Sequence, residues 1–461
     1  MEAKKKFKVV TLGCRTNQYE SQAYADQLKQ MGYTEALAAE EAEVCIVNTC
    51  TVTASADTSS RHEIRKLARE NPLSKIVVTG CLAERIPEEI QAIPGVSHVV
   101  ANKEKENLLA HFFPGQELPE FAIERFAAHT RAFVKVQDGC NSFCTYCIIP
   151  YVRGRSRSRR LEDILKEVQG LVANGYKEVV LTGINIGDFD GAPREGEQPV
   201  RLAELVRAVD AMPGLKRLRV SSIDPDEVDA ELASAILNGK TTCPSMHIVL
   251  QSGSNVILKR MNRKYTREIF IETVEMLRQQ NPDFTFTTDI IVGFPGESEA
   301  DFQDTLEMMG RVGFAKVHMF PYSARERTRA ALYPNKVPPQ VIAARKQELL
   351  RRAELHAFHL REKYIGRKVS VLLEGDETTL PGYLSGHTAN FLPVFVEKKQ
   401  HKANDLVDVE CIENRPDGLI GKELYREVED FVNLHPEFFD LEMCGARRNL
   451  LTDNQMTSGI V

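Results

Sequence analysis

The sequence has no apolar run approaching the roughly 20 residues that a helix needs to span a bilayer, and no internal repeat or low-complexity segment. The lysine run in MEAKKKFKVVTLGC precedes an apolar stretch that is too short for the hydrophobic core of a signal peptide and reads as a strand. These absences predict a cytoplasmic protein without a membrane span. At roughly 150 residues per domain, the chain should form about two to four domains.

A net positive charge is also missing. The chain has 59 Lys and Arg residues against 65 Asp and Glu residues, a formal net charge of -6. This balance excludes a protein that coats nucleic acid by bulk charge and leaves room only for local basic patches. Among the residues present are 10 cysteines, which are rarely disulfides in a reducing compartment. Some of them are therefore expected to be metal ligands or catalytic groups.

Residues 1–125 alternate short apolar strands, such as KFKVVTL, EVCIVNT and KIVVTG, with helical stretches. This alternation predicts an α/β domain with a doubly wound parallel sheet. Three of its strands lead into a cysteine, namely Cys14, Cys50 and Cys81. Because ligands bind at the carboxyl edge of such a sheet, these side chains could meet at one place.

Residues 126–363 continue the alternation with six strands and amphipathic helices such as LEDILKEVQGLVANG. This pattern predicts a partial (β/α)6 barrel whose chemistry lies at the carboxyl ends of its strands. Residues 364–425 change to five close-spaced strands, which predict a small OB-like β-barrel of a type that often binds nucleic acid. Residues 426–461 have no clear period and are interpreted as a tail.

The first loop of the predicted barrel contains Cys140, Cys144 and Cys147 with no fourth cysteine or histidine close behind. A structural zinc site is closed by four ligands. Three thiolates instead suit a cubane iron–sulfur cluster with one iron left free to bind a small molecule. The alternatives are a zinc site with a remote ligand such as His62 or Cys243, or three cysteines clustered by chance.

The spacing C-x3-C-x2-C, with Tyr146 before the last cysteine, resembles the signature of radical S-adenosylmethionine (SAM) enzymes. The surrounding motifs resemble the methylthiotransferase family, and the terminal barrel is similar to that family's RNA-binding TRAM domain. Motifs that carry the resemblance span residues 11–298. They are TLGCRTNQYES, VNTCTVT, TGC, DGCNSFCTYCIIPYVRGRSRSR, LTGINIG, LQSGSN, KRMNRKYT and DIIVGFPGES.

The resemblance implies two [4Fe-4S] clusters. Cys140, Cys144 and Cys147 would hold the cluster that binds SAM and cleaves it to a 5′-deoxyadenosyl radical. Cys14, Cys50 and Cys81 would hold an auxiliary cluster whose open iron carries the sulfur to be inserted. Of the remaining cysteines, Cys45 lies inside a strand and is expected in the core, and three stand singly and are interpreted as structural: Cys243, Cys411 and Cys444.

The resemblance also implies a set of residues near the bound SAM. LTGINIG ends the second barrel strand and DIIVGFPGE ends another, where glycine would allow close backbone contact. The alternative is that these glycines only form tight strand-to-helix turns. The predicted SAM-binding residues are Tyr146, Gly183, Asn185, Gln251, Asp289 and Gly293.

The segment GCRTNQYES is most similar to the subgroup that acts on N6-threonylcarbamoyladenosine in tRNA. The implied reaction is methylthiolation of C2 of that base at position 37, with one SAM supplying the methyl group and a second the radical. Its partners would be tRNA, a sulfur donor, and an electron donor such as flavodoxin or ferredoxin. Two alternatives keep the reaction and change the substrate, either to isopentenyladenosine in tRNA or to an aspartate on a ribosomal protein. A third alternative is a non-catalytic, metal-containing RNA-binding protein whose metal sites are closed by four ligands.

The stretch RGRSRSRR follows the cysteine loop, and its Arg153, Arg155 and Arg157 are interpreted as phosphate contacts. The alternative is a solvated charged segment. In the terminal barrel, Phe391 and Phe395 are either platforms for stacking bases or core residues.

Two positions depart from the family's pattern. Val249 stands where relatives have a proline, which predicts an intact strand with a different local turn. Arg327 stands where a glycine is usual, which predicts an altered loop if that position requires a positive φ. Neither departure touches the predicted cluster ligands.

Overall fold

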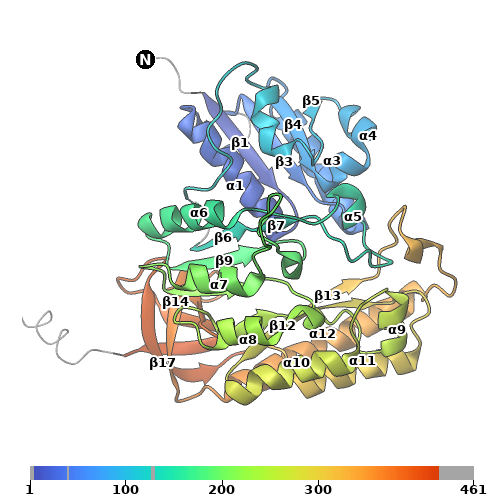
Figure 1. The fold of residues 1–461 in the computed structure, drawn as a ribbon, viewed down its shortest axis with the longest axis vertical. Helices are drawn as coiled ribbons and strands as arrows, with labels where there is room; N and C mark the ends of the chain where they lie inside the picture. The colour runs from blue at the N-terminus through green and yellow to red at the C-terminus, as the bar shows by residue number, and fades with distance from the viewer. Residues whose placement is uncertain (1–4, 39–40, 126–129, 425–461) are drawn as a thin grey trace, which may run out of the picture.

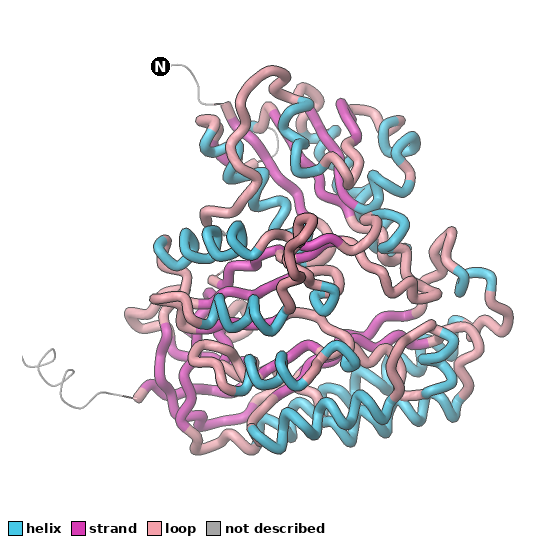
Figure 2. Tube along the Cα trace, viewed as in Figure 1, coloured by secondary structure: helices cyan, strands magenta, loops and turns pink. Residues whose placement is uncertain are grey.

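The computed structural model describes residues 5–38, 41–125 and 130–424. The amino-terminal domain stacks on one side of the central barrel, and the carboxy-terminal barrel packs at the other side (Figure 1). Helices cover the outer face of the central strands, as the tube view makes clear (Figure 2). Within the described residues, no helix is both long and apolar enough to cross a bilayer. The predicted tail and Cys444 lie outside the described residues.

The amino-terminal domain contains a five-stranded parallel sheet in the order β2-β1-β3-β4-β5. Its strands are β1 (Lys6–Thr11), β2 (Thr34–Glu35), β3 (Val44–Thr49), β4 (Lys75–Gly80) and β5 (Val96–Val99). Its helices are α1 (Arg15–Gln30), α2 (Ala54–Glu70), α3 (Cys81–Arg85), α4 (Pro87–Gln91) and the 3-10 helix η2 (Lys105–His111). The predicted segments KFKVVTL, EVCIVNT and KIVVTG form β1, β3 and β4, whereas the two-residue edge strand β2 was not predicted.

Strand β3 is buried on both faces, which explains its continuous apolar run. Val44 and Ile46 pack in one core with Leu28 of α1, whereas Cys45 packs in another core with Leu67 of α2. Helices therefore cover both faces of the sheet, and the predicted doubly wound architecture is confirmed. The prediction that Cys45 is a core residue is also confirmed.

The central domain arranges six parallel strands as a partial barrel. Strands β6, β9 and β10 form one ladder and β11, β12 and β13 a second, and the bridges Leu218–Thr242 and Ile223–Ile248 join the two ladders. The six strands are β6 (Arg131–Lys135), β9 (Glu178–Thr182), β10 (Arg217–Val220), β11 (Ser245–His247), β12 (Thr285–Val292) and β13 (Lys316–Pro321). The short strands β7 (Gln137–Asp138) and β8 (Arg157–Ser158) pair antiparallel beside them.

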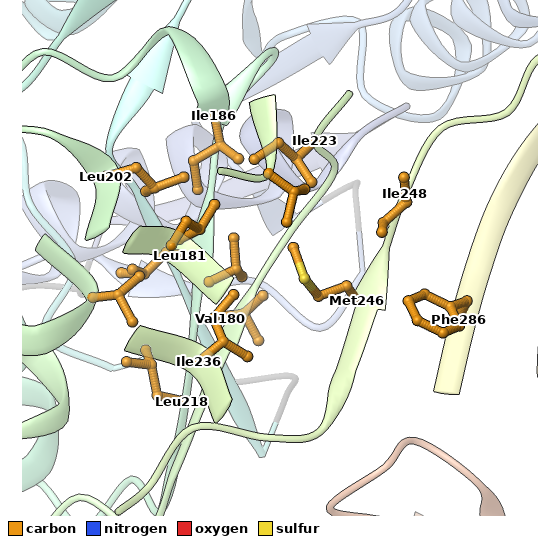
Figure 3. Close-up of a cluster of buried hydrophobic side chains, with 14 of the residues drawn as sticks. Val180, Leu181, Ile186, Leu202, Leu218, Ile223, Ile236, Met246, Ile248 and Phe286 are labelled. Atoms are coloured by element: carbon orange, nitrogen blue, oxygen red, sulfur yellow. The ribbon is translucent and has the colours of Figure 1, made fainter. Parts of the chain in front are cut away.

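Helices connect these strands and cover the barrel's outer face. They are α5 (Ile149–Val152), α6 (Leu161–Ala173), η3 (Ile186–Asp188), α7 (Leu202–Asp210), η4 (Pro225–Glu227), α8 (Ala230–Leu237), α9 (Asn255–Arg260), α10 (Arg267–Gln280), α11 (Glu299–Val312), η5 (Arg329–Leu332) and α12 (Pro339–Glu362). Figure 3 shows Leu202 and Ile236 of two of these helices in one apolar cluster with Leu218 of β10. Because side chains alternate along a strand, Arg217 and Arg219 of β10 lie on the opposite face, toward the barrel lumen.

The carboxy-terminal barrel is closed in the order β14-β15-β16-β18-β17, in which only β16 and β18 pair in parallel. Its strands are β14 (Lys368–Asp376), β15 (Tyr383–Thr388), β16 (Pro393–Glu397), β17 (Leu406–Asn414) and β18 (Leu419–Glu423). This closed five-stranded arrangement confirms the predicted OB-like barrel. It lies at the amino-terminal ends of the central strands, where Arg217 donates hydrogen bonds to the backbone oxygens of His387 and Ser370.

Neither aromatic candidate in this barrel is a free platform for bases. Phe395 is buried in the small barrel. Phe391 stacks on His387 with ring centroids 4.6 Å apart, and the guanidinium groups of Arg131 and Arg219 lie over its ring. Of the two alternatives, the core interpretation is therefore confirmed for Phe395, and Phe391 fills the contact between the two barrels.

The two departures from the family pattern have local explanations. The backbone N–H of Val249 donates to the oxygen of Ile223 at 3.1 Å, a bond that a proline at this position could not make. Arg327 has a φ of 69°, so this position does take the left-handed backbone that favours glycine. Arginine adopts that conformation here, in a loop that contains no cysteine of either triplet.

Candidate active site between the sheet and the barrel

The first cysteine triplet lies at the carboxyl edge of the amino-terminal sheet. Cys14 is the N-cap of α1, Cys50 follows β3, and Cys81 begins α3. Burial raises the pKa of the Cys50 thiol to about 11, and the charges of Cys81 and Cys14 add to this rise. The three side chains are thus close enough to interact. Gly13 is required beside them, because its φ is +98° and an added Cβ would lie 2.8 Å from the Cβ of Cys50.

A buried ion-pair network supports this triplet. The guanidinium of Arg153 lies 3.1 Å from Glu20 and 2.8 Å from Asp138, and Lys105 contacts the same two carboxylates. Arg153 also hydrogen-bonds Asn17, whose amide donates to backbone oxygens beside the triplet. This network joins the amino-terminal domain to the loop of the central barrel.

The interpretation of Arg153 as a phosphate contact is wrong. Its side chain is 0% exposed, since both neighbouring domains and their carboxylates enclose it. Burial raises the pKa of the Cys81 thiol, and the charge of Arg153 opposes that rise. Arg153 therefore acts on the first triplet. Arg155 and Arg157 remain exposed: Arg155 lies over the ring of Phe143 at 4.3 Å.

The second triplet lies in the loop between β7 and α5. Gly139 begins this loop with a φ of +72°, and an added Cβ would lie 2.0 Å from the backbone oxygen of Arg155. The loop path at this point therefore requires glycine. Burial, together with the charge of Cys144, raises the pKa of the Cys147 thiol to about 12.

Arg263 is a site residue that the sequence reasoning missed. It donates a hydrogen bond to the Cys144 sulfur at 2.9 Å, forms an ion pair with Asp224 and lies over the Tyr265 ring at 4.8 Å. These three contacts fix the guanidinium of Arg263 against the sulfur of the second triplet. Arg263 belongs to the motif KRMNRKYT, which indicated the family but not the contact.

One apolar cluster contacts both triplets. Ile148, Ile149 and Val152 of the α5 segment pack with Cys81 of the first triplet, and Cys140 and Cys147 of the second pack against the same cluster. The two cysteine groups therefore lie on either side of a single short helix, although about 60 residues separate them in the sequence.

A cavity of about 240 Å³ opens at this junction. Val52 and Thr53 of the amino-terminal domain form one wall, and Cys147, Tyr146 and Asp289 of the barrel form another. Two further lining residues carry buried polar atoms, Gln251 Oε1 and Tyr322 Oη, that have no hydrogen-bond partner in the described part of the chain. Gln251 also has a φ of +60°. Orphaned polar atoms and a strained backbone at a cavity are typical of a ligand site.

The predicted SAM-binding residues separate into two groups. Tyr146, Gln251 and Asp289 line the cavity. Gly183 and Gly293 do not: an added Cβ would lie 2.9 Å from Gln137 at Gly183, and 2.4 Å from Ile342 of α12 at Gly293. Packing against neighbouring side chains therefore explains these two glycines.

Asn185 follows β9 and donates a hydrogen bond to Glu227 at 2.9 Å. Burial and the charge of Asp224 raise the pKa of Glu227 to about 7, above its value of about 4.3 in an unfolded chain. The folded state thus binds the Glu227 proton more tightly than the unfolded state does. The stability that Glu227 contributes at low pH is lost as the pH rises through 7.

We expect Glu227→Gln to stabilise the fold by about 1–3 kcal/mol at pH 8 and much less at pH 5. Glutamine stays neutral at both pH values and keeps an oxygen that can accept from Asn185. Thermal unfolding at the two pH values measures the difference. An equal shift at both would show that the charge of Glu227 is not the cause.

Polar side chains continue from the cavity into the barrel lumen. His247 Nε2 lies 3.4 Å from Asp289 Oδ1, and its Nδ1 lies 2.9 Å from the Thr287 hydroxyl. The ring of His318 lies 5.8 Å from that of His247, and burial lowers the pKa of His318. The lumen beside the cavity is therefore suited to a polar group.

The described residues form no closed zinc site. Among the described residues, no three His, Cys, Asp or Glu side chains are arranged to hold one metal ion. In a cubane cluster each thiolate binds a different iron, so three cysteines need not converge on one point. Neither His62 nor Cys243 completes a four-ligand site with the described cysteines.

Comparison with protein families agrees with this geometry. A model of the Radical SAM superfamily matches residues 134–309, and a model described as Uncharacterized protein family UPF0004 matches residues 6–101. The fold is also similar to that of the radical S-adenosylmethionine methyltransferase TsrM from Kitasatospora setae, with a TM-score of 0.52 and 15% identity over 69% of this chain and 73% of that one. The barrel and its three-cysteine loop thus define a radical SAM protein.

Similar proteins identify a narrower family within the radical SAM class. The chain is 49% identical to threonylcarbamoyladenosine tRNA methylthiotransferase MtaB of Chlamydia pneumoniae, over 91% of this chain and 99% of that protein. It is 36% identical to the protein of the same name from Bacillus subtilis, over 87% and 92%. It is 38% identical to tRNA-2-methylthio-N(6)-dimethylallyladenosine synthase of Moorella thermoacetica, over 86% and 93%. The chain belongs to the radical SAM tRNA methylthiotransferase family, whose members use SAM and a [4Fe-4S] cluster.

Proposed function

We propose that this chain methylthiolates C2 of N6-threonylcarbamoyladenosine at position 37 of tRNA. The observation that carries the proposal is the 49% identity over 99% of the Chlamydia pneumoniae protein named for that nucleoside. Relatives at 36–38% identity include proteins named for either nucleoside. The polar lumen supports the same substrate. A dimethylallyl group placed there would remove water from Asp289 and His247 without giving them hydrogen bonds, which costs free energy.

We assign the second triplet, Cys140, Cys144 and Cys147, to the cluster that binds SAM, and the first triplet to a second cluster that carries the sulfur. When bound, SAM and its cluster supply a radical that can take hydrogen from an aryl carbon, which has no acidic proton for an ordinary base. Arg263 donates a hydrogen bond to the Cys144 sulfur and so orients it toward the cluster it would hold. The cavity walls come from both domains, so a bound substrate would contact each of them.

The partners of this reaction are proposed on the same basis. The exposed guanidinium of Arg155 lies beside the cysteine loop and is available to a tRNA phosphate. Arg157 is also exposed, but its guanidinium already contacts Asp138 at 3.1 Å and the backbone oxygen of Arg153 at 2.7 Å, so a phosphate would bind beside these contacts. The OB-like barrel supplies a second RNA contact. Flavodoxin or ferredoxin supplies the electron that SAM cleavage needs.

Mass spectrometry of tRNA nucleosides tests the substrate. In a strain that lacks this gene, we expect the methylthio form of threonylcarbamoyladenosine to disappear. The wild-type chain should restore it and Cys144→Ala should not. If instead the methylthio form of isopentenyladenosine disappears, dimethylallyladenosine is the substrate. If neither nucleoside changes, the proposal is wrong and the ribosomal-protein aspartate becomes the next candidate.

A further inference from the structure

Arg15 is a lumen-facing cation that no anionic side chain pairs with among the described residues. It is the first residue of α1, and its guanidinium lies 5.5 Å from the ring centroid of Phe133 on β6. The side chain is partly buried. It forms no hydrogen bond and no ion pair with any residue that the structure describes, whereas the buried Arg153 nearby has three polar partners.

The charges around Arg15 do not neutralise it. Arg131 and Arg219 repel it, while Asp289 and Glu178 attract it. Glu178 is already paired with Arg219 at 2.7 Å, and Asp289 faces His247.

Further arginines and carboxylates lie where the central barrel contacts the small carboxy-terminal barrel. Arg217 lies 3.7 Å from Glu178, and Arg131 lies 3.3 Å from Glu374. Arginines therefore outnumber carboxylates in this region by four to three. The arginines are Arg15, Arg131, Arg217 and Arg219, and the carboxylates are those of Glu178, Asp289 and Glu374. His318 and His387 do not alter that count, since burial lowers the pKa of each imidazole. A partly buried cation without a counter-ion is costly unless an anion binds.

We propose that Arg15 binds the carboxylate of the threonyl group of the substrate nucleoside and thereby selects threonylcarbamoyladenosine. This inference rests on the proposed function. The threonylcarbamoyl group carries one negative charge, which matches the excess of one cation, whereas a dimethylallyl group carries none. A guanidinium presents two parallel N–H donors to a carboxylate, so the contact gives orientation as well as charge.

The position of Arg15 explains how this contact would serve the reaction. Cys14, the preceding residue, belongs to the triplet assigned to the sulfur-carrying cluster, and Asp289 belongs to the cavity wall. A substrate held by Arg15 would therefore lie between the sulfur source and the SAM site. The arginine is a specificity residue and takes no part in bond making.

The test uses the iron-loaded enzyme and two anticodon stem-loop RNAs. One contains threonylcarbamoyladenosine, and the other contains the same nucleoside with its carboxylate replaced by a neutral carboxamide. Both the dissociation constant and kcat/KM are measured. We expect the wild type to prefer the carboxylate RNA by about 10- to 100-fold. Arg15→Gln should bring the two RNAs within about twofold, and Arg15→Lys should give an intermediate preference.

Arg69→Gln is the matched control, because Arg69 is exposed at the end of α2 and should keep the wild-type preference. Iron content is measured for each variant, since Arg15 adjoins Cys14. If Arg15→Gln fails to load iron, two measurements still test the inference. They are the RNA preference of Arg15→Lys and the RNA preference of the wild type. Equal use of both RNAs by the wild type, or an undiminished preference in an iron-loaded Arg15→Gln, would overturn the inference. A wild type that binds the carboxylate RNA no better than an unmodified stem-loop and never methylthiolates it would instead overturn the proposed function.

Discussion

Cys144→Ala is expected to abolish methylthiolation and to remove about half of the iron that the wild-type chain binds, because one of two clusters loses a thiolate ligand. The substitution also removes the sulfur to which Arg263 donates at 2.9 Å. The first triplet keeps all its cysteines, so the remaining iron should stay bound. Iron analysis of anaerobically reconstituted protein, together with nucleoside analysis of treated tRNA, measures both effects.

Cys45→Ala is the matched control for this prediction. Cys45 is a buried cysteine of β3 that packs in the core and belongs to neither triplet. Its replacement should leave iron content and product unchanged and cost about 1 kcal/mol of stability. Full iron content or appreciable product with Cys144→Ala would contradict the assignment of the second triplet.

Arg153→Ala is expected to destabilise the protein by about 3–5 kcal/mol, because it leaves Glu20 and Asp138 buried with one cation fewer. Burial alone would raise the pKa of Glu20, but Arg153 and Lys105 outweigh it and bring the pKa to about 2. The ion pairs therefore stabilise the fold above about pH 4.3 and lose that effect as the pH falls toward 2. Thermal unfolding at pH 7 gives the size of the change.

The same variant should also weaken iron binding by the first triplet, since the charge of Arg153 stabilises the Cys81 thiolate. Arg155→Ala is the control: Arg155 is exposed, and its loss should change stability by no more than about 0.5 kcal/mol. Similar unfolding curves for Arg153→Ala and Arg155→Ala would show that the buried network does not hold the two domains together.

Much of the fold could be predicted because local patterns and tertiary structure agree. The apolar runs of β3 and β4, the helix of Arg267–Gln280 and the close spacing of the last five strands each determine one kind of element. The edge strand β2 was missed because two residues carry no period. The segment after β5 is a 3-10 helix, whose short length leaves no clear amphipathic pattern in the sequence.

The sequence predicted the cysteines of the candidate site but not the arginines that contact them. Cysteine spacing indicated both triplets, because ligand residues of this kind have few other uses in such loops. The burial of Arg153 and the contact of Arg263 with Cys144 could not be predicted, since each depends on a partner more than 100 residues away. The sequence of an arginine run looks the same whether its side chains face solvent or pair with a buried carboxylate.

The sequence by itself determined the family, the fold class of each domain and the six cysteines that are assigned to clusters. Only the tertiary structure decided which charges are compensated. Arg153 and Arg15 look alike in sequence, yet one is enclosed by Glu20 and Asp138 and the other has no partner among the described residues. Electrostatic pairing depends on distance and burial in three dimensions, and neither quantity is encoded in the local pattern around an arginine.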